Sequence, residues 1–104
     1  MIAPGVNECV VQPCRFEAEA PAPTSFILAM FEPMAERLAP QRGVREAICE
    51  MALPIRSGDD LTFSLSITNT DAMTGRMILR GLVIRGRVVC AHVQMTITGS
   101  RDGR

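Results

Sequence analysis

Apolar and polar residues alternate with a period of two through most of the chain after residue 44. The clearest stretch is 61–68, where every second residue is Leu, Phe or Ile and each residue between them is Ser or Thr. The same period over 44–56, 76–85 and 88–98 predicts three further strands. The pattern places five residues of the first of these on one face: Ala47, Cys49, Met51, Leu53 and Ile55.

Turn-forming residues separate the predicted strands. Ser-Gly-Asp-Asp occupies 57–60, a second polar stretch covers 69–75, and Gly86-Arg87 suits a tight hairpin turn. Within 76–85 the alternation slips at Gly81, which indicates a β-bulge. Successive antiparallel strands need only short turns, so we expect these four strands to be joined by hairpin-like connections.

One segment, from Thr24 or Ser25 to about Ala39, has apolar residues at helical spacing. Thr24 or Ser25 can supply the N-cap, Pro40 ends the helix, and Pro33 should kink it because proline removes a backbone donor. The stripe repeats every four residues, widened by two neighbours, and consists of Phe26, Met30, Met34, Leu38, Ile27 and Phe31.

The residues before this helix predict one more strand and a loop. Cys9–Phe16 has the pattern of a short strand, in which Pro13 favours an edge position. Glu17–Pro23 is a loop held extended by its prolines. The order is one strand, one long helix and four strands, which predicts an α+β domain of two layers in which a curved antiparallel sheet of about five strands wraps the helix. We expect residues 1–7 and 99–104 to be flexible.

Composition limits the classes of function. The chain has 104 residues, enough for one domain spanning 1–104, and its 11 basic and 11 acidic residues give no net charge. Net neutrality argues against nucleic acid or a membrane as partner, and no apolar run approaches the length of a membrane span. The chain has no lysine, which excludes a Schiff base, and a single histidine, His92, which excludes a histidine cluster.

The cysteines indicate a reducing compartment. The chain shows no secretory signal, and its four cysteines, Cys9, Cys14, Cys49 and Cys90, form no C-x-x-C pair. We therefore expect free thiols, a cytoplasmic location, no bound metal and no cofactor. Cys90 has no base nearby in the sequence, which disfavours a role as nucleophile.

The segment Leu53-Pro-Ile-Arg-Ser-Gly-Asp-Asp-Leu61 resembles the Pro-Val-x-Pro-Gly-Asp-x-Leu run of β-hydroxyacyl-acyl-carrier-protein dehydratases, which are hot-dog proteins. Gly58-Asp59 matches the Gly-Asp turn of that family, with Ser57 where the family has proline. The predicted helix falls where the central helix of the family lies, and 83–98 is similar to its last two strands. This resemblance implies a hot-dog fold, with one central helix wrapped by the sheet, and a dimer.

The resemblance is weaker at the catalytic positions. Family dehydratases carry a His-Phe-Pro signature before the helix and an acidic residue on it. Aligning Pro21 with that proline puts Glu19 at the histidine position, and His92 lies on the last predicted strand. The acidic position on the helix is matched by Glu32. Glu32 is therefore the leading catalytic candidate, as base, nucleophile or water-orienting group, and Glu19 is a possible second carboxylate.

Each candidate also has a plainer explanation. Glu32 could be a solvated glutamate, and Glu19 a charged loop residue. Arg37, near the apolar stripe, could bind a phosphate of a carrier arm or of coenzyme A, or could extend its stem along the layer to water. Phe31 joins Arg37 as a candidate substrate-binding residue. His92 falls on the polar side of its strand and suits a surface or an interface.

Two hypotheses related to the resemblance stay open, beside an unrelated α+β interaction module. The chain could act on an acyl thioester of acyl-carrier protein or CoA, as a dehydratase or thioesterase, in fatty-acid or polyketide-type metabolism. It could instead be a catalytically silent dehydratase-like subunit that binds an acyl chain or pairs with an active partner. The first hypothesis implies a homodimer, and the second allows a heterodimer with another hot-dog subunit.

Overall fold

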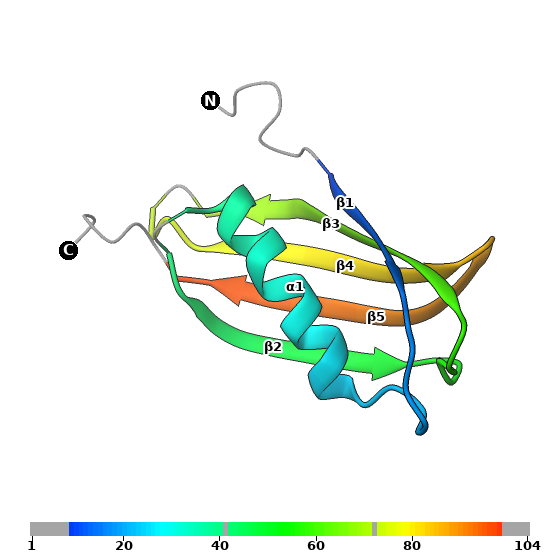
Figure 1. The fold of residues 1–104 in the computed structure, drawn as a ribbon. Helices are drawn as coiled ribbons and strands as arrows, with labels where there is room; N and C mark the ends of the chain where they lie inside the picture. Colours follow the sequence, from blue (N-terminus) through cyan, green and yellow to red (C-terminus); the bar gives the residue numbers. More distant parts are fainter. Residues whose placement is uncertain (1–8, 41, 72, 99–104) are drawn as a thin grey trace.

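The structure, a computed structural model, describes residues 9–40, 42–71 and 73–98. One helix lies against a single five-stranded sheet, as the α+β prediction requires (Figure 1). The elements in chain order are β1 Val10–Arg15, α1 Thr24–Leu38, β2 Val44–Met51, β3 Asp60–Thr70, β4 Met77–Arg85 and β5 Val88–Ile97. The expected flexible ends, 1–7 and 99–104, lie outside the described residues.

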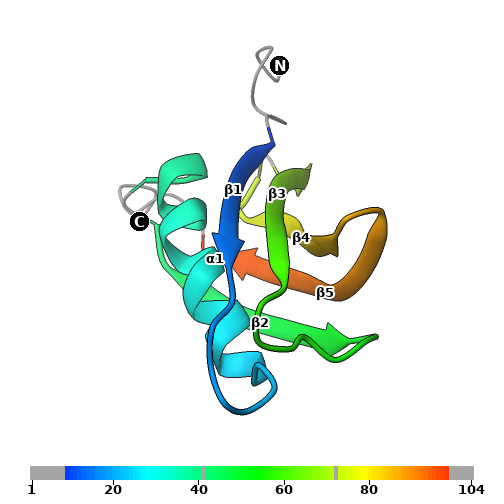
Figure 2. The same cartoon turned by 45° about the vertical axis from the view of Figure 1, so that its right-hand side comes forward.

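The sheet is antiparallel throughout and curves around the helix (Figures 1 and 2). Its strand order is β1-β3-β4-β5-β2, so β1 and β2 form the two edges. The expectation that β2 and β3 form a hairpin is wrong, because β2 pairs with β5 instead. The two hairpins that do form are β3–β4 and β4–β5.

The segment between β2 and β3 crosses one end of the sheet instead of turning back. The amides of Ala52 and Leu53 donate to the Cys90 carbonyl at 2.7 and 3.0 Å, which holds the segment on β5. The Ala22 amide then donates to the Ile55 carbonyl, and the Gly58 amide to the Phe16 carbonyl. The strand predicted over 44–56 is too long: β2 ends at Met51, and Leu53 lies in the crossing segment, where it is 38% exposed.

The helix presents a different face to the sheet from the one that the four-residue repeat predicts. Its buried residues are Ile27, Phe31, Met34 and Ala35, whereas Phe26 and Met30 are half-buried. Each step of four residues overshoots one helical turn by about 40°, so the repeat rotates by about 120° around the helix from Phe26 to Leu38, and only Met34 of the repeat is buried. The expected cap is also wrong, since Thr24 and Ser25 lie inside the helix and Pro23 occupies the N-cap.

Gly81 is required by packing and not by a bulge. It keeps a regular register with Leu65 and Val93, while the irregularities of β4 lie at other positions. A Cβ at Gly81 would come within 2.8 Å of two ring carbons of Phe31, which is fully buried. The Phe31 ring also packs edge-on against Phe63, with centroids 5.4 Å apart. Glycine therefore lets the helix approach the centre of the sheet.

Candidate functional site

Glu32 projects from the side of α1 that faces β2. The Arg37 guanidinium donates to the Gln12 side chain on β1 at 3.2 Å, which fixes the flank of the helix facing that edge. Glu32 precedes Arg37 by five residues, and this spacing separates the two side chains by about 140° around the helix axis. Glu32 therefore lies on the opposite flank of the helix. Since β1 and β2 are opposite edges of the sheet, the exposed Glu32 side chain lies on the β2 side.

The two edges of the sheet differ in their capacity to pair with another strand. β1 carries Pro13, which has no backbone N–H to donate. β2 has no proline over its eight residues and no neighbour on its outer side among the residues that the structure describes. Its exposed side chains include Ile48 at 49% and Val44 at 39%. An open edge with exposed apolar residues suits pairing with another chain.

The helix begins beside an apolar hollow of about 450 Å³. Among the residues that the structure describes, no side chain caps α1, and its first turn has no acidic residue. The first backbone amides of a helix lack intrahelical acceptors and attract negative charge. The hollow is formed by the end of β1, the loop after it and the helix start; its apolar lining consists of Phe16, Ala18, Ala20, Pro21, Pro23 and Phe26.

The other sequence-predicted site residues are dispersed. Glu19 is exposed on the loop between Ala18 and Ala20, both of which line this hollow. Glu32 follows the helix start by eight residues, about 12 Å along the axis, and no described contact joins it to Glu19. Phe31 is fully buried, so within one chain it offers no surface to a ligand.

The turn at Gly58-Asp59, which carries the family resemblance, has a structural role. Gly58 has φ of +91°, a conformation that side chains rarely adopt. The Arg56 amide donates to the Asp59 carboxylate at 2.8 Å and the Arg85 guanidinium donates at 3.1 Å. These two donors, the amide first, hold the pKa of Asp59 below its usual value. Sequence reasoning missed the contact that Arg85 makes with this turn from the end of β4, because no local pattern links the two segments.

The thiols and the histidine lie apart from this region. All four cysteines are free, and the described residues contain no group of three or more His, Cys, Asp or Glu side chains placed to hold a metal. Partial burial raises the pKa of the Cys49 thiol. His92 is exposed on β5, as expected, and helps frame a hollow on the face of the sheet away from α1.

Solved structures share this architecture at low sequence identity. The (R)-hydratase from A. caviae involved in PHA biosynthesis matches with a TM-score of 0.80 at 11% identity, over 91% of this chain and 96% of that one. The gentisyl-coenzyme A thioesterase BH1999 matches at 0.73 and 14%, over 86% and 88%. A mutant of the phenylacetic acid degradation protein PaaI from Thermus thermophilus matches at 0.76 and 15%, over 96% and 90%.

The chain has the hot-dog fold. No protein-family model and no curated protein sequence match it. The identity to the three solved structures is 11 to 15%, so the similarity shows a shared fold and assigns no reaction to this chain. Within the described ranges, no helix is both long and apolar enough to cross a membrane.

Proposed function

We propose that this hot-dog protein binds an acyl thioester and hydrolyses it, with Glu32 as the general base or water-orienting carboxylate. The observation that carries the proposal is the place of Glu32, on the flank of the helix that faces the open β2 edge. A second chain paired to β2 would stand beside this carboxylate and would form one wall of a site there. The proposed active unit is therefore a dimer joined through β2.

Two further features support a thioester as the ligand. The apolar hollow at the helix start, about 12 Å along the helix axis from Glu32, can accept the end of an acyl chain whose carbonyl lies beside Glu32. The three solved neighbours are named as a hydratase, a coenzyme A thioesterase and a phenylacetic acid degradation protein. The carrier is CoA or acyl-carrier protein, and Arg37 is proposed to bind its phosphate from the β1 flank.

Hydrolysis is favoured over dehydration by the position of the histidine. His92, the only one in the sequence, lies on the outer face of the sheet, which excludes it from a pair with Glu32 in the same chain. A carboxylate alone can activate water for attack on a thioester carbonyl, with release of the thiol. Four free thiols suit a reducing cytoplasm, which we propose as the location, with fatty-acid or polyketide-type metabolism as the setting.

The test compares wild type with Glu32→Gln on a saturated acyl-CoA and on a β-hydroxyacyl-CoA of the same chain length. Thiol release measures hydrolysis, and enoyl absorbance measures dehydration. We expect Glu32→Gln to lower the hydrolysis rate by roughly 100- to 10,000-fold, as for loss of a general base, with fold and mass unchanged.

Two further variants control this comparison. Glu36→Gln, one turn further along α1, should keep the wild-type rate. Glu19→Gln should keep it too unless Glu19 shares the chemistry, in which case the loss should match that of Glu32→Gln. Equal rates for wild type and Glu32→Gln would remove Glu32 from the reaction. No turnover of either substrate by wild type would favour the silent-subunit hypothesis, which pull-down of an active hot-dog partner then tests.

A further inference from the structure

The space between α1 and the sheet is closed to a substrate. Ile27, Phe31 and Met34 of the helix are fully buried there. The Phe31 ring lies so close to Gly81 that a Cβ at that position would come within 2.8 Å of it. Within this chain, an acyl group whose carbonyl lies beside Glu32 must therefore run along the exposed surface of the helix.

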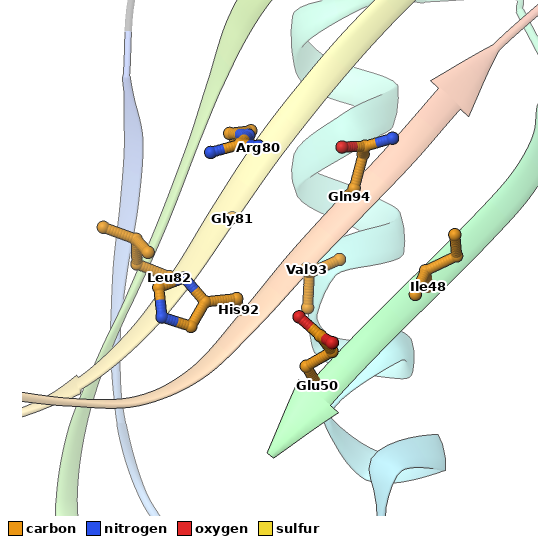
Figure 3. A pocket seen from close by; sticks show the side chains of 8 residues that line it. All are labelled: Ile48, Glu50, Arg80, Gly81, Leu82, His92, Val93 and Gln94. Atoms are coloured by element: carbon orange, nitrogen blue, oxygen red, sulfur yellow. The ribbon is translucent and has the colours of Figure 1, made fainter. Parts of the chain in front are cut away.

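The hollow on the outer face of the sheet does not suit the end of such an acyl chain (Figure 3). It lies across the sheet from α1, and its frame includes the polar side chains Glu50, Arg80, His92 and Gln94. The hollow at the helix start is lined by rings and methyl groups, apart from Arg15 and Glu17, which pair with each other at 2.7 Å. An alkyl group can leave water there without stripping water from an unpaired charge.

Three helix residues connect Glu32 to the hollow at the helix start. Phe26, which lines the hollow, is followed at intervals of three by Ala29 and then by Glu32. Residues three apart are neighbours on the surface of a helix, with Cβ atoms about 5–6 Å apart, so the three form one continuous row. Ala29 is exposed and carries only a methyl group, which leaves the middle of this row open.

The length of this row sets the length of the acyl chain. The two steps of the row span about 10–12 Å, and an extended alkyl chain with bonds of about 1.5 Å at near-tetrahedral angles advances about 1.25 Å per carbon. The chain therefore reaches Phe26 after roughly nine carbons. We propose that the substrate is a medium-chain acyl thioester of about 10 to 12 carbons, whose chain crosses Ala29 and ends in the hollow at the helix start. This inference rests on the proposed function, because Glu32 fixes the position of the carbonyl.

Hydrolysis of butyryl-, hexanoyl-, octanoyl-, decanoyl- and dodecanoyl-CoA tests the proposal, with kcat/KM as the readout. The two shortest chains end on the helix surface before Phe26, so their values should be similar. Each methylene buried beyond Phe26 should raise kcat/KM about fourfold. Three buried methylenes give about 50-fold, and dodecanoyl-CoA should exceed hexanoyl-CoA by at least about that factor.

Three variants locate the route of the chain, with circular dichroism to verify folding. Ala29→Leu places a branched side chain across the row at little cost in helix propensity. It should lower the dodecanoyl-to-butyryl ratio of kcat/KM at least about tenfold, because the chain end no longer reaches the hollow. Ala20→Glu puts a carboxylate into the lining and should lower the same ratio. Glu36→Leu, the matched control, adds leucine to α1 on the side of Glu32 away from the hollow and should keep the wild-type ratio.

The chain-length inference and the proposed reaction fail in different ways. If wild type hydrolyses the series but dodecanoyl-CoA shows no gain over hexanoyl-CoA, the inference is wrong and the reaction stands. The same conclusion follows if folded Ala29→Leu keeps the wild-type ratio.

If wild type hydrolyses none of these substrates, the proposed reaction is wrong, and calorimetry with thioether analogues of hexanoyl- and dodecanoyl-CoA decides the route. Tighter binding of the dodecanoyl analogue, lost in Ala29→Leu, would support a chain that runs along the helix to the hollow. Equal binding of the two analogues would overturn it.

Discussion

Replacing Gly81 with alanine should destabilise the protein, although alanine normally suits a strand better than glycine. The backbone at Gly81 is not in the left-handed region, so the φ angle gives no penalty. The penalty comes from the added methyl group, which would lie 2.8 Å from two carbons of the Phe31 ring and 3.3 Å from a third. Because that ring is fully buried between helix and sheet, it can yield only by moving its neighbours.

The expected loss is about 1 to 2 kcal/mol in the free energy of unfolding. Inserting a methyl into a well-packed core costs about 1–3 kcal/mol, and the loss of glycine's freedom in the unfolded chain returns about 0.4–1 kcal/mol. For a domain of this size, the net loss lowers Tm by roughly 5–15 °C. Chemical denaturation followed by circular dichroism measures the first quantity, and a thermal melt measures the second.

Two comparisons isolate the contact between Gly81 and Phe31. Gly43→Ala is the matched control, since its new methyl would find only the Thr98 hydroxyl, at 3.8 Å, and should change stability by less than about 0.5 kcal/mol. Phe31→Leu shortens the opposing side chain, so the double variant Gly81→Ala/Phe31→Leu should lose at least about 0.5 kcal/mol less than the sum of the single losses. If Gly81→Ala were as stable as wild type, the packing explanation for this glycine would be wrong.

Three further predictions concern burial, pH and thiol access. Met34→Asp should abolish the cooperative thermal transition, because Met34 is fully buried. Met30→Asp, at a half-buried position, should still fold. Identical thermal melts for the two variants would contradict the assigned helix face. The pKa of Asp59 is lowered in the folded state, so its ionised carboxylate stabilises the fold above about pH 4, and this stabilisation is lost as the pH falls through the folded-state pKa. Asp59→Asn should therefore lower Tm at pH 7 and make Tm depend less on acid pH. A variant with the same Tm–pH curve as wild type would refute this. Under mild alkylation followed by mass spectrometry, exposed Cys9 should react before fully buried Cys90, and the reverse order would contradict the fold.

Local patterning was sufficient to predict the elements of this protein. The alternation from Leu61 to Ile67 corresponds to buried positions along β3, and the residues of Gly86-Arg87 form the β4–β5 turn. These features depend on neighbours within a few residues, so the sequence alone carries them. Their order along the chain was also enough to predict a helix packed on one antiparallel sheet.

Features that depend on distant contacts were predicted less well. The slip at Gly81 resembles a bulge in the sequence, but its cause is the ring of Phe31, fifty residues away. The pairing of β2 with β5 could not be inferred from turn residues. The crossing segment is held by backbone hydrogen bonds that it donates to the carbonyls of Phe16 and Cys90, and by one that the Ala22 amide donates to it. Glu32 was found through a resemblance, while its position beside the open edge required the strand order.

The most direct test of the proposed function is a crystal structure with a thioether analogue of an acyl-CoA. In this analogue a methylene group stands between the sulfur and the carbonyl, so the carbonyl is kept but the bond to sulfur cannot be hydrolysed. We predict a dimer joined through β2, with the analogue at the interface and its acyl carbonyl beside Glu32. An analogue bound only in the hollow of the outer face, or a β2 edge without a second chain, would contradict the account.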